Sequence, residues 1–480
     1  MLDRWMRTGG RVVTGAVTAA LVAGMAGGAC SPGSKRLASK ASTTSSTARA
    51  GATTSSSPPA GVTAGWTTYF GDAGRSGVAA DGPAAPRSVR RQWASGALDG
   101  DVYAQPLIVR DRVIVATGND TVYALDAATG AIVWSRHLGT PVPSSSLPCG
   151  DVDPVGITST PVVDPAAGRV YVVGMAQPAH HTLFDLDLAT GSVVASAGAD
   201  APGADPTTHN QRGALSLDGG TVLVPFGGRF GDCGSYHGQL VAVPSTPTGL
   251  GPPTAYTLPT GREGGFWAPP GPVTASDGSI YLASGNSASR GTYDYGNSVV
   301  HLSAALKLVD SFAPADWAAL NSTDSDLGST SPVLVGGNRV FQIGKAGTGY
   351  LLDGGRLGGV GGQLSSAKVC SGPSLGGVSH TGTTLFVPCP GGVEAVDVTA
   401  DRVVVRWASP ASTPGPPIAT TGAVWTVATG SGELAAIDPV SGGRLISQQI
   451  GRVPSRFTSP AAGGGRVVVA AGRTVMAFGD

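Results

Sequence analysis

The sequence predicts an all-β fold, an eight-bladed β-propeller of four-stranded blades closed by an N-terminal strand that completes the last blade. Three observations predict it. A strand–turn–strand segment recurs eight times, strand-like hairpins precede these copies, and the last copy lacks a strand that a segment near the start can supply. Such repeats are typical of propellers, because one small sheet exposes two apolar faces that only neighbouring sheets can bury.

The clearest copy of the repeat is TVYALDAATGAIVW, residues 121–134. Its alternating apolar residues predict a strand, Ala127 to Gly130 predict a tight turn, and Ala131 to Trp134 predict the partner strand. Three aligned aspartates, Asp353, Asp397 and Asp438, follow one another at roughly the 40–50 residues expected for a propeller blade. Weaker copies occupy residues 182–194, 238–249, 297–312, 348–359, 391–407, 432–446 and 473–480.

Two more strand-like runs precede the copies of the repeat. Each pair reads as a short hairpin around a Gly-rich or Asp-containing turn. Two strands and two more give the four strands of one blade. The clearest of these hairpins occupy residues 106–118, 160–175, 271–286, 331–345 and 459–472.

Closure of the ring is predicted from the two ends of the repeat region. The sequence stops at Asp480, after the third strand of the last unit. The segment RSVRRQWAS, residues 87–95, precedes the first complete blade and carries Trp93 where Trp134 and Trp407 stand in other copies. We expect it to pair with the last blade and so remove both open sheet edges.

The composition agrees with a folded chain that is dense in turns. The 480 residues include 74 Gly and 36 Pro, and 41% are hydrophobic, which excludes a disordered chain. Lys and Arg (31) balance Asp and Glu (31), and no basic stripe stands past residue 91. An electrostatic nucleic-acid surface is therefore not expected.

Residues 1–30 have the pattern of a targeting segment. Arg4, Arg7 and Arg11 form a positive region, and residues 12–29 are small or apolar without a charge. Such a segment predicts a secretory signal rather than part of the fold. No other stretch is long and apolar enough to span a bilayer.

Cys30 directly follows this segment, and the arrangement resembles a bacterial lipoprotein signal, in which that Cys is lipidated. Gly27 departs from the pattern, which prefers Leu there. Ordinary cleavage that leaves a free Cys, or an uncleaved anchor helix, are the alternatives. Residues 31–65 are Ser, Thr, Ala and Pro with few large apolar side chains, which predicts a flexible tether before the propeller domain of residues 66–480.

The A-x-D-x-x-T-G-x-x-x-W pattern of residues 124–134 resembles the repeat of pyrroloquinoline-quinone-type (PQQ-like) propellers, and the resemblance covers about residues 66–480. Residues 66–77 resemble the leader that precedes such propellers. The family includes calcium-dependent quinone alcohol dehydrogenases, poly(vinyl alcohol) dehydrogenases and the non-enzymatic propeller of the outer-membrane β-barrel assembly machine. The resemblance implies the fold but not an activity.

The resemblance also implies a cofactor site, which this sequence matches in part. In the dehydrogenases, Ca²⁺ holds the quinone through oxygen ligands from a Glu, an Asn and an Asp. Asn286 resembles the Asn ligand, and Lys345 resembles the basic residue that contacts the quinone. However, Ala318 follows the run that precedes the catalytic Asp, Cys233 stands where the Glu ligand is expected, and the adjacent-Cys pair is absent.

Residues 324–332, DSDLGSTSP, are similar to a stretch of the poly(vinyl alcohol) dehydrogenases. Asp324 or Asp326 could supply a carboxylate near the channel. The alternative is that residues 326–329 form only a turn that enters an innermost strand, since Asp, Gly and Ser are the residues that turns require.

Four cysteines remain in the exported domain, where disulfides persist. We expect Cys149 to pair with Cys233 and Cys370 with Cys389, although the sequence alone does not fix this connectivity. No metal site is expected, because there is no C-x-x-C motif and residues 180–181, His-His, lack a third ligand nearby.

Several polar and aromatic residues fall in loops that we expect to face the central channel. A concave mouth with a few converging polar groups predicts a binding site. The structural alternative is that Arg212 and Asp326 only line the channel. The candidates are His209, Gln211, Arg212, Trp267 and Lys345.

No nucleophile elbow or phosphate loop is present. The favoured interpretation is an exported propeller, lipid-anchored on the outer face of the cytoplasmic membrane or secreted, that binds or scaffolds a protein or small molecule without catalysis and without a cofactor. The alternative is a PQQ- and Ca²⁺-dependent dehydrogenase of an alcohol or sugar, using Asn286, Lys345 and Asp326.

Overall fold

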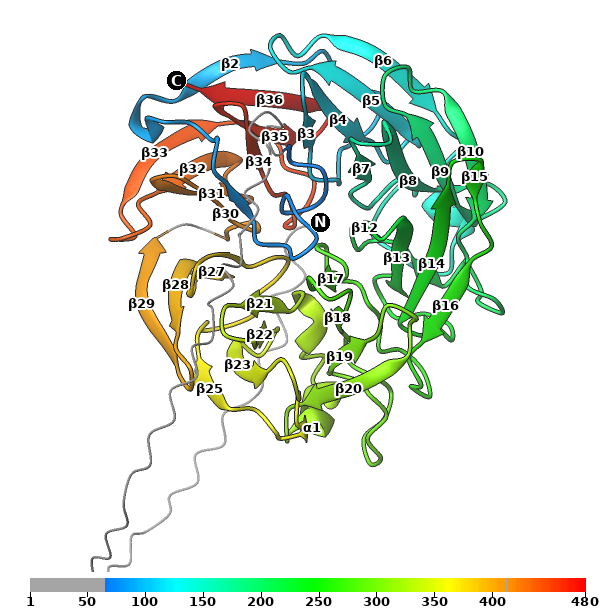
Figure 1. Cartoon of the computed structure of the whole chain (residues 1–480), viewed down its shortest axis with the longest axis vertical. Coiled ribbons are helices and arrows are strands. Elements are labelled where there is room, and N and C mark those ends of the chain that lie inside the picture. Colours follow the sequence, from blue (N-terminus) through cyan, green and yellow to red (C-terminus); the bar gives the residue numbers. More distant parts are fainter. Residues whose placement is uncertain (1–64, 411–412) are drawn as a thin grey trace, which may run out of the picture. The chain divides into compact units, whose positions relative to one another are not determined.

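The computed structural model describes residues 65–410 and 413–480. Eight sheets stand around a central axis in chain order, which confirms the predicted eight-bladed propeller (Figure 1). The predicted signal segment, Cys30 and nearly all of the predicted tether lie outside the described residues. No helix of the described ranges is long and apolar enough to cross a bilayer.

The blades are numbered 1 to 8 in chain order. Blade 1 contains β3 (Leu107–Val109), β4 (Arg112–Ala116), β5 (Thr121–Asp126) and β6 (Ile132–His137), and blade 2 contains β7 (Val162–Asp164), β8 (Arg169–Ala176), β9 (His180–Asp187) and β10 (Val193–Gly198). Blade 3 contains β11 (His209–Asn210), β12 (Ser216–Asp218), β13 (Thr221–Gly228), β14 (Gln239–Thr246), β15 (Gly249–Leu250) and β16 (Thr254–Thr257). Blade 4 contains β17 (Val273–Thr274), β18 (Ile280–Ala283), β19 (Val299–Leu302), β20 (Leu308–Ala313) and β24 (Gly359–Val360). Blade 5 contains β21 (Val333–Val335), β22 (Arg339–Ile343), β23 (Thr348–Asp353) and β25 (Ser365–Lys368), and blade 6 contains β26 (Ser379–Thr381), β27 (Thr384–Cys389), β28 (Gly392–Val398) and β29 (Val403–Pro410). Blade 7 contains β1 (Val78–Ala79), β30 (Ile418–Thr420), β31 (Ala423–Ala428), β32 (Glu433–Ile437) and β33 (Arg444–Gln449). Blade 8 contains β34 (Ala461–Gly463), β35 (Arg466–Ala471), β36 (Thr474–Gly479) and β2 (Arg90–Ala94). Short helices are η1 (Pro86–Ser88), η2 (Ser144–Ser146), α1 (Trp317–Ser322) and η3 (Leu327–Ser329).

The predicted closure of the ring is confirmed. β2 pairs antiparallel with β36 and forms the outermost strand of blade 8, so the N-terminal and C-terminal parts of the propeller share one sheet (Figure 1). The indole N–H of Trp93 in β2 donates to the carbonyl oxygen of Ala127 in blade 1, at 3.0 Å. This bond ties the closing strand to the next blade.

The recurring Asp and Gly of the repeat build the outer turn of a blade and its dock for the neighbouring blade. In blade 2, Asp187 accepts the backbone N–H groups of Ala189 and Thr190, and Gly191 has a positive φ of 69°. The Trp134 ring of blade 1 lies against Gly191, where a Cβ would stand 2.5 Å from that ring. The Trp134 indole N–H donates to Leu188 O at 3.1 Å.

The middle strands of the blades form the core, because they are covered on both sides by neighbouring blades. All six residues of β31 are buried, whereas the outermost β25 alternates between half-buried and exposed residues. This explains why the middle strands are continuous apolar runs and the outer strands are mixed.

One copy of the repeat ends differently from the prediction. Residues 348–359 were expected to contain both outer strands of a blade. The structure instead uses residues 359–360 as β24, which pairs in parallel with β20 of blade 4, and β25 supplies the fourth strand of blade 5. Gly358 and Gly359 both have positive φ, which lets the chain leave its own blade here.

The leader, residues 66–79, runs near the centre of the ring, beside the innermost strands (Figure 1). Its carbonyls accept backbone N–H groups from the innermost strands of different blades, those of Ile108, Val163, Thr274, His380 and Ala419. Arg75 is 3% exposed and donates to the carbonyls of Tyr69, Leu215 and Pro272.

Candidate functional site

The channel mouth is built from loops that enter or flank the innermost strands. We use the term for Arg212, Trp267, Asp326, Lys345 and Phe457. Arg212 precedes β12, Trp267 precedes β17 and Asp326 precedes η3. Lys345 follows β22, and Phe457 precedes β34. Each side chain comes from a different loop, within a blade for Arg212 and Lys345 and between blades for the others, so the ring brings together residues far apart in the sequence.

A buried ion pair occupies one side of the mouth. The Asp326 Oδ2 atom lies 2.5 Å from Lys345 Nζ, and its Oδ1 accepts the backbone N–H of Asn286 at 2.6 Å. Asp326 is 4% exposed. Gly285 makes this approach possible, since a Cβ there would stand 2.6 Å from Asp326 Oδ1 and 3.0 Å from the Trp267 Nε1 atom.

Lys345 is shared between two carboxylates, since its Nζ also lies 2.8 Å from Asp324 Oδ1. Burial opposes the charge on Lys345, but the carboxylates outweigh it and raise the pKa of this ammonium. Burial raises the pKa of Asp326, although Lys345 acts in the opposite direction. The three side chains together carry one net negative charge when all are ionised.

Aromatic rings connect this pair to a second cation. Lys345 Nζ lies 5.8 Å from the centre of the Trp267 ring, and Trp267 meets Phe457 edge-on with 6.1 Å between the ring centres. The Arg212 guanidinium lies 5.3 Å from the centre of the Phe457 ring, within the range of a cation–π contact. The mouth thus presents an acidic side, an aromatic strip and a basic side.

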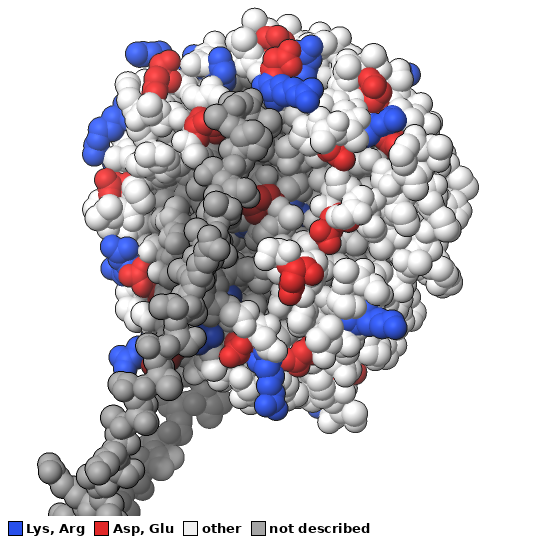
Figure 2. Space-filling model, in the orientation of Figure 1, with Lys and Arg blue, Asp and Glu red and all other residues white. Residues whose placement is uncertain are grey.

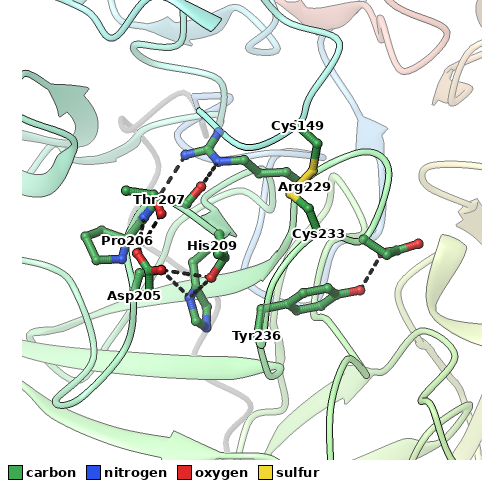
Figure 3. The surroundings of a disulfide bond; sticks show 10 residues. Cys149, Asp205, Pro206, Thr207, His209, Arg229, Cys233 and Tyr236 are labelled. Atoms are coloured by element: carbon green, nitrogen blue, oxygen red, sulfur yellow. Dashed lines mark hydrogen bonds between the residues drawn. A yellow bond between two sulfur atoms is a disulfide. The ribbon is translucent and has the colours of Figure 1, made fainter. Parts of the chain in front are cut away.

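The structure brings Asn286, Lys345, Asp326, Arg212 and Trp267 together, but it places the remaining two candidates inside loop packing. His209 is 2% exposed, and its Nδ1 lies 2.8 Å from the Asp205 carbonyl oxygen (Figure 3). Gln211 is 3% exposed, and its Nε2 donates to Gly213 O at 2.7 Å. Both side chains therefore hold the loop that carries Arg212.

Phe457 is a mouth residue that the sequence reasoning missed. It stands three residues before Pro460, just ahead of the innermost strand β34. Trp267 is likewise followed by a Pro at 269 and 270 before β17. An aromatic residue two or three positions before the Pro that leads into an innermost strand was a signal that could have identified it.

Residues 326–329 carry both roles that the sequence left open. Leu327–Ser329 form the 3-10 turn η3 ahead of β21, and the Asp326 carboxylate that precedes this turn faces Lys345. The turn therefore aims the carboxylate at the mouth.

Both predicted disulfides are confirmed. Cys149 pairs with Cys233, joining the loop after blade 1 to blade 3, and Cys370 pairs with Cys389. Around the first bridge, Arg229 donates to the carbonyls of Thr207 and Pro206, and the two donors hold this loop in place (Figure 3).

The mouth does not offer the donor set that calcium requires. Ca²⁺ takes six to eight oxygen ligands, usually with several carboxylates. Among the described residues, no three His, Cys, Asp or Glu side chains are grouped to hold a metal ion. Asp326 already faces an ammonium at 2.5 Å, Cys233 is held in a disulfide, and Ala318 lies in α1 with no group to donate.

The comparisons with known proteins agree with the fold. Residues 65–246 match the PQQ_2 family model, described as outer membrane protein assembly factor BamB. No curated protein matches the sequence. The match and the fold confirm the predicted resemblance to PQQ-type propellers.

Solved structures of similar fold include dehydrogenases and a BamB protein. The quinohemoprotein alcohol dehydrogenase ADHIIG from Pseudomonas putida HK5 is 14% identical with a TM-score of 0.69, covering 87% of this chain and 80% of that one. A europium-containing methanol dehydrogenase is 14% identical with a TM-score of 0.66, and the match covers 87% of this chain and 98% of that one. BamB from Moraxella catarrhalis is 11% identical with a TM-score of 0.54, covering 82% and 100%. At these identities the likeness shows the fold alone.

Two disulfides and a BamB-type match together indicate an extracytoplasmic protein, since disulfides persist in oxidising compartments. On the face drawn in Figure 2, acidic and basic side chains are interspersed on a mostly uncharged surface.

Proposed function

We propose that this chain is an extracytoplasmic propeller, tethered to the membrane through Cys30, that binds a ligand or partner at its channel mouth and performs no quinone chemistry. The observation that carries the proposal is the state of Asp326. Its carboxylate is neutralised by Lys345 at 2.5 Å and by the Asn286 N–H at 2.6 Å. A carboxylate so engaged is a poor ligand for a divalent cation, because binding would have to displace the ammonium.

Binding at the mouth is supported by its chemistry. Trp267, Phe457, Arg212 and Lys345 are each half-buried there. Aromatic surface beside a few oriented charges is typical of binding sites.

The alternative is a quinone-dependent dehydrogenase of an alcohol or sugar, and one observation favours it. Asn286, Asp326 and Lys345, the three positions that the family resemblance marks, converge within hydrogen-bonding distance. The arrangement keeps part of a cofactor site, although it lacks the glutamate and the catalytic aspartate.

Adding pyrroloquinoline quinone and Ca²⁺ to the purified full chain separates the two functions. We expect no rise in melting temperature, no quinone absorbance retained after gel filtration and no dye reduction with alcohols or sugars. A ligand that prefers the native state must stabilise it, so a clear rise in melting temperature would favour the dehydrogenase function. If such a rise occurs, Asp326→Asn should abolish it, and that pair of results would overturn the proposal.

Crosslinking in the native cell envelope tests binding at the mouth directly. A photoreactive residue at Arg456, beside the mouth, is expected to crosslink a ligand or partner. The same residue at Val440, which is 72% exposed on an outer turn, serves as the control. Equal or absent crosslinking at both positions would argue against the mouth.

Membrane tethering is tested by Cys30→Ala. The variant should lose incorporation of a labelled fatty acid and move from the membrane to the soluble fraction, as expected when the lipid anchor is removed. Retention of the variant in membranes would show that an uncleaved helix, rather than a lipid, holds the protein.

A further inference from the structure

His209 is a buried histidine whose two ring nitrogens have different kinds of partner. Its Nδ1 atom lies 2.8 Å from the Asp205 carbonyl oxygen (Figure 3). Its Nε2 atom lies 3.4 Å from the backbone nitrogen of His237. A carbonyl oxygen only accepts and a backbone N–H only donates, so Nδ1 carries the proton and Nε2 offers its lone pair. Both contacts therefore select the neutral form of the ring.

These contacts hold the loop that brings Arg212 to the mouth. The loop, residues 199–212, pairs with β13 only through the two residues of β11. Arg229, in the loop that follows β13, donates to Thr207 O at 2.6 Å. His209 and Arg229 thus tie residues 199–212 to residues 229–238, the loop that the Cys149–Cys233 bridge also holds (Figure 3).

A proton on Nε2 of His209 would have no acceptor in this packing. It would face the His237 N–H, so that two donors meet, and it would place a positive charge on a side chain that is 2% exposed. Among the described residues, no carboxylate lies within 4.0 Å of His209, whereas the buried His181 has Asp200 Oδ1 at 2.7 Å. Protonated His181 would keep a partner, and protonated His209 would not.

The charged and titratable groups around His209 do not offset the cost of that charge. Burial is the largest influence and lowers the pKa of His209 from its ordinary 6.5, although the bond to Asp205 O acts in the opposite direction. A histidine with a lowered pKa favours the packed loop above its ordinary pKa and loses that contribution as the pH falls below it. The surrounding groups are His181 of β9, Asp200 and Asp205 of the same loop, and Arg229, Asp232, Tyr236 and His237 of the loop between β13 and β14.

We propose that His209 is a proton-sensitive latch: the neutral ring holds residues 199–212 against residues 229–238, and protonation in mild acid releases the loop and frees Arg212 from Thr158 and Phe457. Histidine is suited to this role because its charge changes between pH 5 and pH 8. The release depends only on the contacts around His209, whereas its effect on binding rests on the proposed function.

Hydrogen–deuterium exchange of the full chain at pH 7.5 and pH 5.5, corrected for the intrinsic effect of pH on exchange, measures the release. We expect opening of residues 199–212 to increase by up to about tenfold at pH 5.5, because a freed histidine with its ordinary pKa takes up a proton over this interval. In His209→Gln, whose carboxamide keeps a donor and an acceptor without titrating, opening should be equal at both pH values. The control is His380→Gln, since His380 also contacts a carbonyl oxygen through Nδ1 but is half-buried in blade 6; it should leave the response unchanged.

Two results would overturn the latch: opening of residues 199–212 that does not change with pH, or a pH dependence that persists in His209→Gln. If His209→Gln is open at both pH values, exchange of the His209 C2 proton in the parent protein decides, because a titration that does not follow the opening of the loop would also overturn the latch.

Crosslinking at Arg456 tests the effect of the latch on binding. Crosslinking should fall at pH 5.5 in the parent protein but not in His209→Gln, and equal crosslinking despite release of the loop would overturn the role of the latch at the mouth. Absence of crosslinking at either pH would count against the proposed function, and hydrogen exchange would still decide the latch.

Discussion

Removal of Lys345 should destabilise the propeller by leaving Asp326 as a buried charge without its partner. Breaking a buried ion pair by deleting one side costs about 3–5 kcal/mol. Here Lys345 keeps 22% of its side chain exposed and Asp326 retains the Asn286 N–H, so we expect a smaller cost than that range, about 2–3 kcal/mol, for Lys345→Met at pH 7.

The pH dependence of the stability loss in Lys345→Met identifies the unpaired Asp326 charge as its cause. Burial already raises the pKa of Asp326, and loss of the ammonium raises it further. A carboxyl whose folded pKa lies above its unfolded value favours folding at low pH and loses that contribution as pH rises. The Lys345→Met penalty should therefore be smaller at pH 4 than at pH 7, because protonation of Asp326 removes the unpaired charge.

Equilibrium urea unfolding at both pH values measures the effect, provided that unfolding is reversible. Lys368→Met is the matched control, because Lys368 is exposed and donates only to the Ala346 carbonyl; it should change stability by less than about 0.5 kcal/mol. The double variant Asp326→Asn with Lys345→Met should recover most of the loss. A Lys345→Met penalty below about 0.5 kcal/mol, or one equal at pH 4 and pH 7, would refute the reasoning.

Three further outcomes follow from the packing. Gly191→Ala should cost about 2–4 kcal/mol in urea unfolding, because its positive φ and the Trp134 ring 2.5 Å from the new Cβ leave no room; a loss under 0.5 kcal/mol would contradict this. Burial raises the pKa of Asp120 to about 8, so the contribution of its protonated carboxyl to folding stability falls as pH rises from about 4 to 8. Asp120→Asn should therefore be more stable than the parent protein at pH 9 but not at pH 5. Thiol reductants should open the half-buried Cys149–Cys233 bridge before the fully buried second disulfide; mass spectrometry of alkylated peptides reads the order, and the reverse order would contradict it.

The blades and their closure could be predicted because each depends on a local pattern. A turn of the type found at Asp187 to Gly191 needs an Asp that accepts two N–H groups and a Gly with positive φ, so it leaves a signature in five residues. Trp93 repeats the position of Trp134, which is why the closing strand was recognisable before the sheet was known. The disulfide pairings were predictable because Cys149 and Cys233 fall in insertions of neighbouring blades, while Cys370 and Cys389 flank a blade boundary.

The mouth was predictable only in part, since loop residues have no period that sets the direction of a side chain. His209 and Gln211 stand beside Arg212 in sequence, yet they turn into the loop and only Arg212 turns to the channel. Phe457 meets Trp267 from nearly 200 residues away, a pairing that depends on the closed ring. The leader was expected to precede the propeller, but its bonds to several innermost strands appear only in three dimensions.

The closure of this propeller and the chemistry of its mouth come from different parts of the blades. Middle strands such as β31 are wholly buried, and tryptophan docks such as that of Trp134 tie neighbouring blades together, so closure of the ring rests on these contacts and not on the mouth residues. Arg75 shows how the fold satisfies a buried guanidinium when the role is structural, with its three nitrogens engaged by protein oxygens. Arg212 is engaged less fully, since its guanidinium donates through Nη1 to Thr158 O and lies over the Phe457 ring, while its Nη2 has no hydrogen-bond partner among the described residues. The mouth is therefore where the fold leaves a cationic side chain incompletely paired, whereas the leader satisfies Arg75 in full.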